Sequence, residues 1–224
     1  MARQVKTREK NPYIIVFWEG ESEEVYMKFL RKTFHVYANL TVHNQKGVFS
    51  VAKKSILSPK GRYYADRKEI DQIWFIFDTE QNLKGKWGEF EDIINRLKKL
   101  HKEMVVRLLM TKGCIEYYFL LHYEQCAPFI ESKSDKDHIQ NRLERTYVSG
   151  YKKGDSEKIE LIGQNYLNAI ENGKWSLKQI EGEIGSVEQS EERDFRLFMT
   201  NSTFTTVHEG VQFLLDRKNS VSDE

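Results

Sequence analysis

The segment Ile73-Trp74-Phe75-Ile76-Phe77-Asp78-Thr79-Glu80 decides the fold of this chain. Its first five residues are all β-branched or aromatic and show no alternation with polar residues, which is typical of a strand buried on both faces of a sheet. The run stops at one acid, and a second acid follows two residues later. A strand that is buried on both faces needs helices on both sides of its sheet, so the segment predicts an α/β protein.

A second apolar run, Tyr13-Ile14-Ile15-Val16-Phe17-Trp18, repeats this pattern. The helix expected after it starts near Ser22, which can cap its amino end, and Glu23 and Glu24 suit the positive end of the helix dipole. The other elements expected in this half are strands at 40–43 and 104–109 and helices at 22–30, 48–57 and 90–100. Strands that alternate with helices indicate crossover connections and a mostly parallel sheet.

The pattern changes to helices after residue 113, with segments expected at 115–123, 135–146, 156–171 and 205–217. We therefore predict an α/β core at 1–112, a helical region packed on it at 113–218, and a flexible tail at 219–224. Apolar faces in the helical half leave room for a homo-oligomer.

Composition places the chain among globular proteins, with 39% apolar and 31% charged residues out of 224. No apolar run reaches the roughly 18 residues of a membrane span, and the charged amino terminus lacks a signal-type apolar core. We expect a cytoplasmic protein with no membrane partner. Cys114 and Cys126 have no zinc-type spacing, and a net charge of +1 neither favours nor excludes a polyanionic partner.

Acids follow both of the strongest strands: Glu19 comes directly after the first, and Asp78 and Glu80 end the other. The carboxyl ends of parallel strands share one edge of the sheet, so these side chains should gather there. Residues two apart in extended chain point the same way, which favours a metal shared by Asp78 and Glu80. Carboxylates suit Mg²⁺ or Mn²⁺. Gly20 would allow a sharp turn and leave room for a phosphate.

Four segments in order resemble the RloB-like family, whose Toprim-domain proteins are associated with bacterial restriction and phage-defence loci. The segment from Tyr13 to Leu30 resembles the first Toprim motif, and Ile73–Glu80 is similar to the Toprim strand that ends in Asp-x-Asp. Cys114–His122 resembles the family's Cys-Phe-Glu-x-Trp-x-Leu-Leu-His segment. Thr205–His208 is similar to its closing Thr-x-Val-His.

The resemblance implies a Toprim-like core with a helical carboxyl-terminal extension, and it gives the metal roles to Glu19, Asp78 and Glu80. Glu80 departs from the family's second aspartate and is one methylene longer. Lys112-Gly113 replaces the Asn-Pro that precedes the family's cysteine. These departures affect loop details more than the class of protein.

Three further residues have two interpretations each. Glu116 is either a further metal ligand or base for an attacking water, or an ordinary acid at a helix start. His122 and His208 either satisfy hydrogen bonds in the core or orient a carboxylate. Cys114 is expected to be packed rather than catalytic, because no histidine is placed as its base.

Basic residues crowd one stretch of the chain, and Tyr63 and Tyr64 lie among them. This basic segment consists of Lys53, Lys54, Lys60, Arg62, Arg67 and Lys68. It either contacts phosphates and stacks on bases or forms a solvated surface. Lys152 and Lys153 are a second candidate of the same kind.

The function predicted from these residues and from the resemblance is a Mg²⁺-dependent nuclease that cuts DNA or RNA, tRNA included, in bacterial anti-phage defence or abortive infection. The alternative is a noncatalytic module that binds nucleic acid or a nucleotide and is regulated by a partner ATPase. The chain contains no P-loop pattern, so nucleotide hydrolysis would have to come from that partner.

Overall fold

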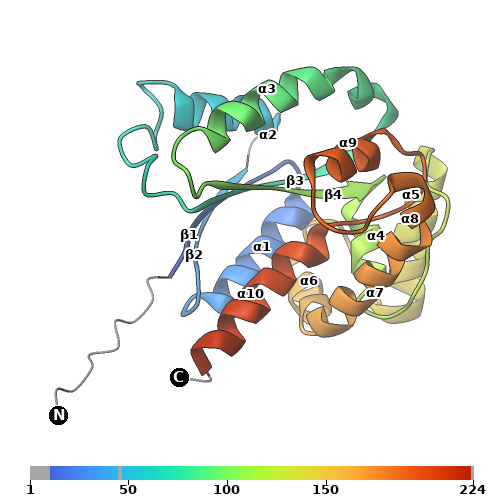
Figure 1. Cartoon of the computed structure of the whole chain (residues 1–224). Coiled ribbons are helices and arrows are strands. Elements are labelled where there is room, and N and C mark those ends of the chain that lie inside the picture. The colour runs from blue at the N-terminus through green and yellow to red at the C-terminus, as the bar shows by residue number, and fades with distance from the viewer. Residues whose placement is uncertain (1–10, 45–46, 223–224) are drawn as a thin grey trace, which may run out of the picture.

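The computed structural model describes residues 11–44 and 47–222, and this part of the chain forms a four-stranded parallel sheet (Figure 1). The strands are β1 (Tyr13–Trp18), β2 (Asn39–Asn44), β3 (Gln72–Thr79) and β4 (Val105–Lys112). Their order in the sheet is β2-β1-β3-β4, and each neighbouring pair is parallel. The predicted Toprim-like α/β class is confirmed.

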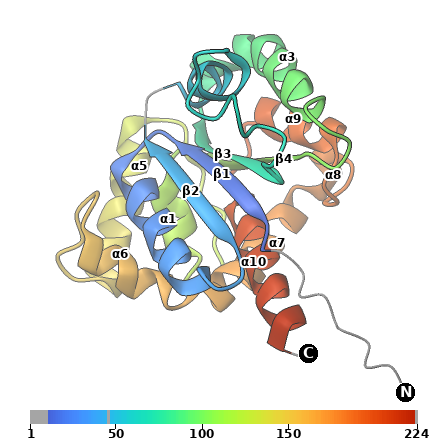
Figure 2. The same cartoon turned by 90° about the vertical axis from the view of Figure 1, so that its left-hand side faces the viewer.

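Helical segments make all three crossovers between the strands. They are α1 (Glu21–Phe34), α2 (Val48–Ala52) with the π-helical turn η1 (Lys53–Leu57), and the 3₁₀ turn η2 (Gln81–Lys86) with α3 (Trp87–Lys98). Helices α2 and α3 lie on one face of the sheet, and α1 lies on the other (Figures 1 and 2).

The second half of the chain is helical, as predicted. Its elements are α4 (Ile115–Leu120), α5 (Lys133–Arg142), the π-helical turn η3 (Leu143–Tyr147), α6 (Ser156–Gly163), α7 (Tyr166–Gln179), α8 (Glu181–Ile184), α9 (Glu191–Met199) and α10 (Val207–Ser222). No described helix is long and apolar enough to cross a membrane.

Several elements of this half differ from the sequence prediction. The helix expected at 156–171 is two helices, because the chain breaks between Gly163 and Tyr166. Helices α8 and α9 were not predicted; Ser190 caps α9 by accepting a hydrogen bond from the Arg193 amide at 3.1 Å. The helix expected at 205–217 is α10, which ends at Ser222 and so includes 219–222 of the predicted tail. Residues 223 and 224 of the predicted tail lie outside the described residues.

Alternate residues of the strands enter two separate hydrophobic clusters. Val16 and Trp18 of β1 belong to the cluster covered by α1, α4, α6, α7 and α10. Ile15 and Phe17 belong to the cluster under α2, α3 and α9. Both faces of β1 are therefore apolar, which explains why its sequence does not alternate with polar residues.

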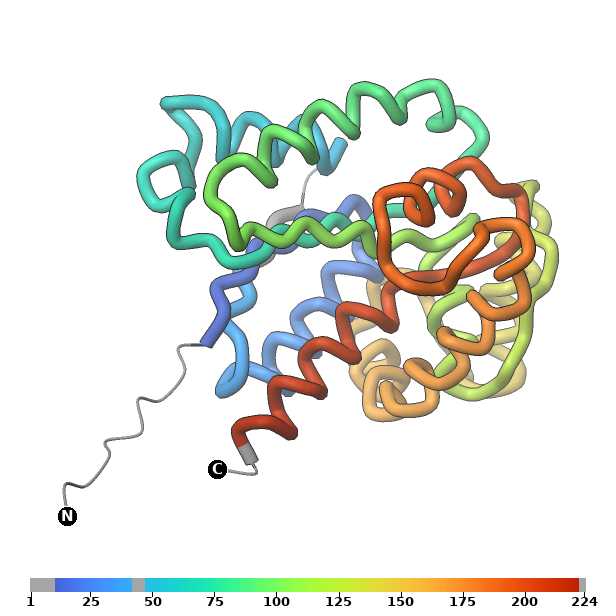
Figure 3. The backbone as a smooth tube through the Cα atoms, viewed as in Figure 1, coloured from blue at the N-terminus to red at the C-terminus, as the bar shows by residue number. Residues whose placement is uncertain are grey.

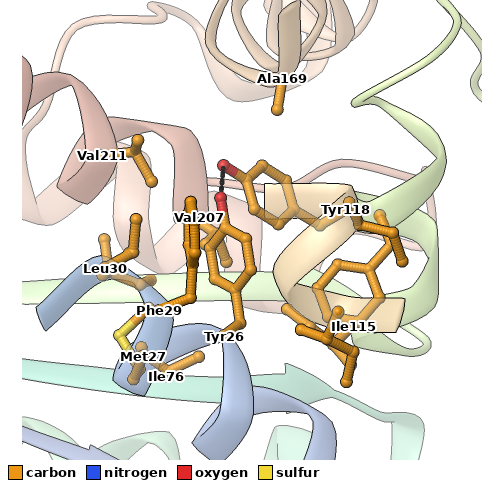
Figure 4. Packing of buried hydrophobic residues seen from close by; sticks show 14 of the residues in the cluster. Tyr26, Met27, Phe29, Leu30, Ile76, Ile115, Tyr118, Ala169, Val207 and Val211 are labelled. Carbon is orange, nitrogen blue, oxygen red and sulfur yellow. Dashed lines mark hydrogen bonds between the residues drawn. The ribbon is translucent and has the colours of Figure 1, made fainter. Parts of the chain in front are cut away.

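Tyr26 on α1 and Tyr118 on α4 point toward one another in the larger cluster (Figure 4). Their hydroxyls lie 3.3 Å apart, and the Tyr26 hydroxyl lies 3.1 Å from Nε2 of His122. Burial lowers the pKa of His122 to about 3, so the ring is neutral at physiological pH. His122 therefore satisfies a hydrogen bond in the core, which is the first of the two interpretations of this residue.

Two threonines of the closing motif bind the backbone of β4. Thr205 forms an antiparallel bridge with Thr111. The Thr206 amide donates to Met110 O at 2.8 Å, and the Thr206 hydroxyl donates to Leu108 O at 2.8 Å. This segment caps the open edge of the sheet and leads into α10, which runs alongside α1 (Figure 3).

Gly113 turns the chain from β4 into α4, and we expect Gly113→Ala to destabilise the protein. Its φ is +91°, and an added Cβ would lie 2.4 Å from Cγ2 of Ile130. The two effects together should cost about 2 kcal/mol or more, measured by urea unfolding. Gly88→Ala is the control, because a Cβ there meets no atom within 4 Å. Equal unfolding midpoints for the two variants would contradict this account of the turn.

Candidate metal centre

The predicted acids all lie at the carboxyl edge of the sheet. Glu19 directly follows β1. Asp78 is the second-last residue of β3, and Glu80 directly follows that strand. Glu116 lies in the first turn of α4, just after β4. The parallel pairing of β3 with both β1 and β4 brings these positions together.

Three of the acids at this edge repel one another: Glu23, Asp78 and Glu116. Burial, followed by repulsion from Glu23 and Glu116, raises the pKa of Asp78 well above its usual range. Burial raises the pKa of Glu23 from 4.5 to about 7. Among the neighbouring charges, Glu116 contributes most to this rise. At this edge, burial and mutual repulsion therefore both disfavour the charged forms of Asp78 and Glu23, and a nearby cation would favour them.

Glu23 was not among the predicted site residues. In the sequence it has the appearance of an ordinary acid in the first turn of a helix, and it does occupy that turn of α1. Its side chain is only 7% exposed, because it turns back toward the sheet edge rather than into solvent. Its place four residues after Glu19, across a glycine, is the one signal in the sequence that points to it.

Gly20 has a different role from the predicted one. Its φ is −108°, which any residue adopts, so no sharp turn depends on it. An added Cβ would lie 2.1 Å from Oε2 of Glu23. The space above Gly20 is therefore filled by the Glu23 carboxyl group, and the expectation of a glycine turn with room for a phosphate was wrong.

Glu116 is held in place by three groups from distant parts of the chain. Its Oε1 accepts hydrogen bonds from the Ser22 hydroxyl at 3.3 Å and the Tyr151 hydroxyl at 3.1 Å. The ammonium of Lys153 lies 3.5 Å from Oε2. Burial is the largest single effect and lowers the pKa of Lys153, but attraction to Glu116, Cys114 and Asp78 together outweighs burial and leaves the pKa raised. Glu116 is 1% exposed and so is a fixed, oriented carboxylate rather than a solvated acid.

Glu19 and Glu80 have partners within the protein. Oε1 of Glu19 accepts hydrogen bonds from the Gly47 amide at 2.9 Å and the Val48 amide at 3.4 Å. Glu80 forms an ion pair with Lys136 of α5. The negative charge of Glu80 still raises the pKa of Asp78, and that of Glu19 raises the pKa of Glu23.

The donor set at this edge fits a hydrated magnesium ion. Within residues 11–44 and 47–222, no three His, Cys, Asp or Glu side chains are grouped closely enough to form a complete protein cage for a metal. Mg²⁺ does not need such a cage, since it usually binds one or two carboxylates and keeps several waters. Asp78, with Glu23 and Glu116 near it, supplies hard oxygen donors and an unbalanced negative charge.

Of the two interpretations of the basic segment, stacking on bases is not supported for Tyr63. Tyr63 is 5% exposed and packs in the cluster under α2 and α3, so it cannot stack on a base. The guanidinium of Arg67 lies 3.7 Å from the centre of the Tyr64 ring. Lys53 and Lys54 line a pocket with Arg96, in the last turn of α3. That turn leads back to the amino edge of the sheet, away from the acids.

The comparisons with known proteins identify one family. The model of the RloB-like protein family matches residues 14–214, which is most of the chain. No curated protein and no solved structure matches it.

The raised pKa of Glu23 predicts how stability depends on pH. Between pH 4.5 and about 7 the folded state binds more protons at Glu23 than the unfolded state, so stability falls as the pH rises through this range. Glu23→Gln should remove this loss. Its free energy of unfolding at pH 8 should exceed that of the wild type by up to about 3 kcal/mol, and the difference should vanish near pH 4.

Urea unfolding at the two pH values measures this effect, with Glu103→Gln as an exposed control that should show no such difference. A Glu23→Gln protein that is no more stable than the wild type at pH 8 would show that Glu23 carries no excess charge at this edge.

Proposed function

Because the chain belongs to the RloB-like family, we propose that it is a magnesium-dependent nuclease that hydrolyses phosphodiester bonds in DNA or RNA. The observation that carries the proposal is the group of buried, mutually repelling carboxylates at the carboxyl edge of the parallel sheet. Structural proteins have little reason to keep such a group, because each buried charge is costly unless it is paired. A divalent cation with a phosphate would offset that cost.

We assign each side chain a role in the reaction from its burial and its hydrogen-bond partners. Asp78 offers carboxylate oxygens to the metal, and Glu116 is a fixed carboxylate beside it because Ser22 and Tyr151 orient it. Magnesium, when bound, would stabilise the developing negative charge and acidify a water. Glu23 has a pKa of about 7, which suits a group that takes a proton from the attacking water at neutral pH.

Glu19 and Glu80 remain predicted metal ligands. For each, binding a metal means exchanging its present partner: the amides of Gly47 and Val48 for Glu19, and Lys136 for Glu80. If Glu80 bound a metal, its ion-pair partner Lys136 would be available to a substrate phosphate.

From the resemblance to proteins of restriction and phage-defence loci, we further propose a role in bacterial anti-phage defence or abortive infection, in the cytoplasm and with a partner ATPase as the source of nucleotide hydrolysis. Glu19 and Glu80 already have partners within the protein, the Gly47 amide and Lys136. This favours one alternative: a module that binds nucleic acid or a nucleotide and gains activity only with its partner. The two proposals differ in whether the isolated chain cleaves.

We expect the purified protein to cut plasmid DNA or total RNA in the presence of Mg²⁺ or Mn²⁺. Cleavage should stop when a chelator removes the metal. Asp78→Asn should slow cleavage by at least about 100-fold, since loss of a supporting residue at a metal site already costs 10- to 100-fold. Asp92→Asn, an exposed acid on α3, is the control and should cleave like the wild type. Rates come from gel densitometry.

Cleavage that survives unchanged in Asp78→Asn would exclude this metal centre as the active site. Binding without cleavage by the isolated wild-type chain, followed by cleavage once a partner ATPase is added, would favour the regulated module.

A further inference from the structure

Lys112, the last residue of β4, is a buried cation without a counter-ion. Its side chain is 4% exposed, and among the described residues no carboxylate lies within ion-pair distance of it. It lines a pocket of about 390 Å³. The other residues that line this pocket are Thr79, Glu80, Gln81, Asn82, Gly113, Ile130, Glu131, Lys133 and Lys136.

The cations around Lys112 increase its need for an anion. Burial, and then repulsion from Lys84, lowers the pKa of Lys112. Glu80 is already occupied by Lys136, and Lys84 donates a hydrogen bond of 2.7 Å to the side chain of Asn201. Exposed Lys133 adds a further positive charge to the pocket. Among the described residues the ammonium of Lys112 forms no ion pair, although Glu131 of the same pocket attracts it, so an anion in the pocket would give Lys112 a direct partner.

The pocket adjoins the candidate metal centre. Thr79 and Glu80, which line it, follow Asp78 directly in the chain. An anion bound by Lys112 would therefore lie beside the group proposed to be cleaved, where a neighbouring phosphate of the same strand belongs.

An exposed aromatic side chain lies next to this pocket in the sequence. Phe129 is 64% exposed, although large apolar side chains are usually covered. It precedes Ile130, which is fully buried and lines the pocket, and Pro128 O accepts a hydrogen bond from the Thr203 hydroxyl. The backbone is thus held on both sides of Phe129 while its ring stays open to a ligand.

We propose that this pocket binds single-stranded nucleic acid, with a backbone phosphate on Lys112 and Lys133 and an unpaired base stacked on Phe129. Lysine ammonium groups with an adjacent aromatic ring are the combination that recognises single strands, since a base inside a duplex has no free face to stack. The inference rests on the proposed nuclease function and adds to it the strand form of the substrate.

Fluorescence anisotropy in chelator tests the site without cleavage, with a short labelled single strand, as DNA and as RNA, and a duplex of the same sequence. The wild type should bind the single strand more tightly than the duplex. Lys112→Met should weaken binding about tenfold and reduce the slope of log affinity against log salt by about 0.7, the value for one lost phosphate contact. Phe129→Ala should weaken single-strand binding at least about fivefold and leave the salt slope unchanged.

Lys102→Met is the matched control, because Lys102 is an exposed lysine before β4, at the opposite edge of the sheet. Lys133→Met, at an exposed position, gives a second test if Lys112→Met fails to fold; it too should lower the salt slope. Unchanged affinity in Lys133→Met and Phe129→Ala, or equal binding of duplex and single strand, would overturn the inference.

These outcomes are independent of the nuclease proposal. Metal-dependent cleavage together with unchanged binding by the pocket variants would reject the pocket and keep the nuclease. Weakened binding by those variants in a protein that never cleaves would keep the pocket and reject the nuclease.

Discussion

Burial of the parallel sheet on both faces is the constraint on which the rest of the structure depends. Each fully buried apolar side chain contributes roughly 1.5–3 kcal/mol, and the two central strands, β1 and β3, consist almost entirely of such residues between their ends. No charged group can be placed in the middle of β1 or β3 without losing that contribution. Polar chemistry is therefore confined to the strand ends, and the crossovers of a parallel sheet bring those ends to one edge.

At that edge the chain pairs Glu116 with Lys153 and Glu80 with Lys136 but leaves other charges without an ion pair among the described residues. The acids Glu23, Asp78 and Glu116 lie where α1 and α4 meet the sheet, and the cation Lys112 lies in the pocket beside α5. Lys153 neutralises only part of the acidic group, since the pKa values of Glu23 and Asp78 stay raised. Buried groups with raised pKa values in one place are typical of functional sites, and under the proposed function they would serve a metal and a polyanion.

Much of the fold follows from local sequence patterns, and the missing parts depend on contacts between distant residues. The apolar runs ending at Trp18 and Phe77 identify two central strands and place Glu19 and Asp78 at one edge. Helix α9 was missed because it buries Arg193, a residue type that is normally exposed. Its guanidinium donates hydrogen bonds to the carboxylate of Glu209 on α10, a contact between distant residues that the local pattern does not show. Glu23 was missed because its sequence pattern is that of a capping acid, and the Lys112 pocket because the loop after α4 builds its far wall.

The most direct test of the central claim is a crystal structure of the protein grown with Mn²⁺, examined for anomalous scattering. We expect a peak bonded to a carboxylate oxygen of Asp78, at a distance of about 2.0–2.3 Å, with Glu23 or Glu116 beside it. A protein saturated with Mn²⁺ that shows no peak at the carboxyl edge, or a peak only at another part of the surface, would contradict it.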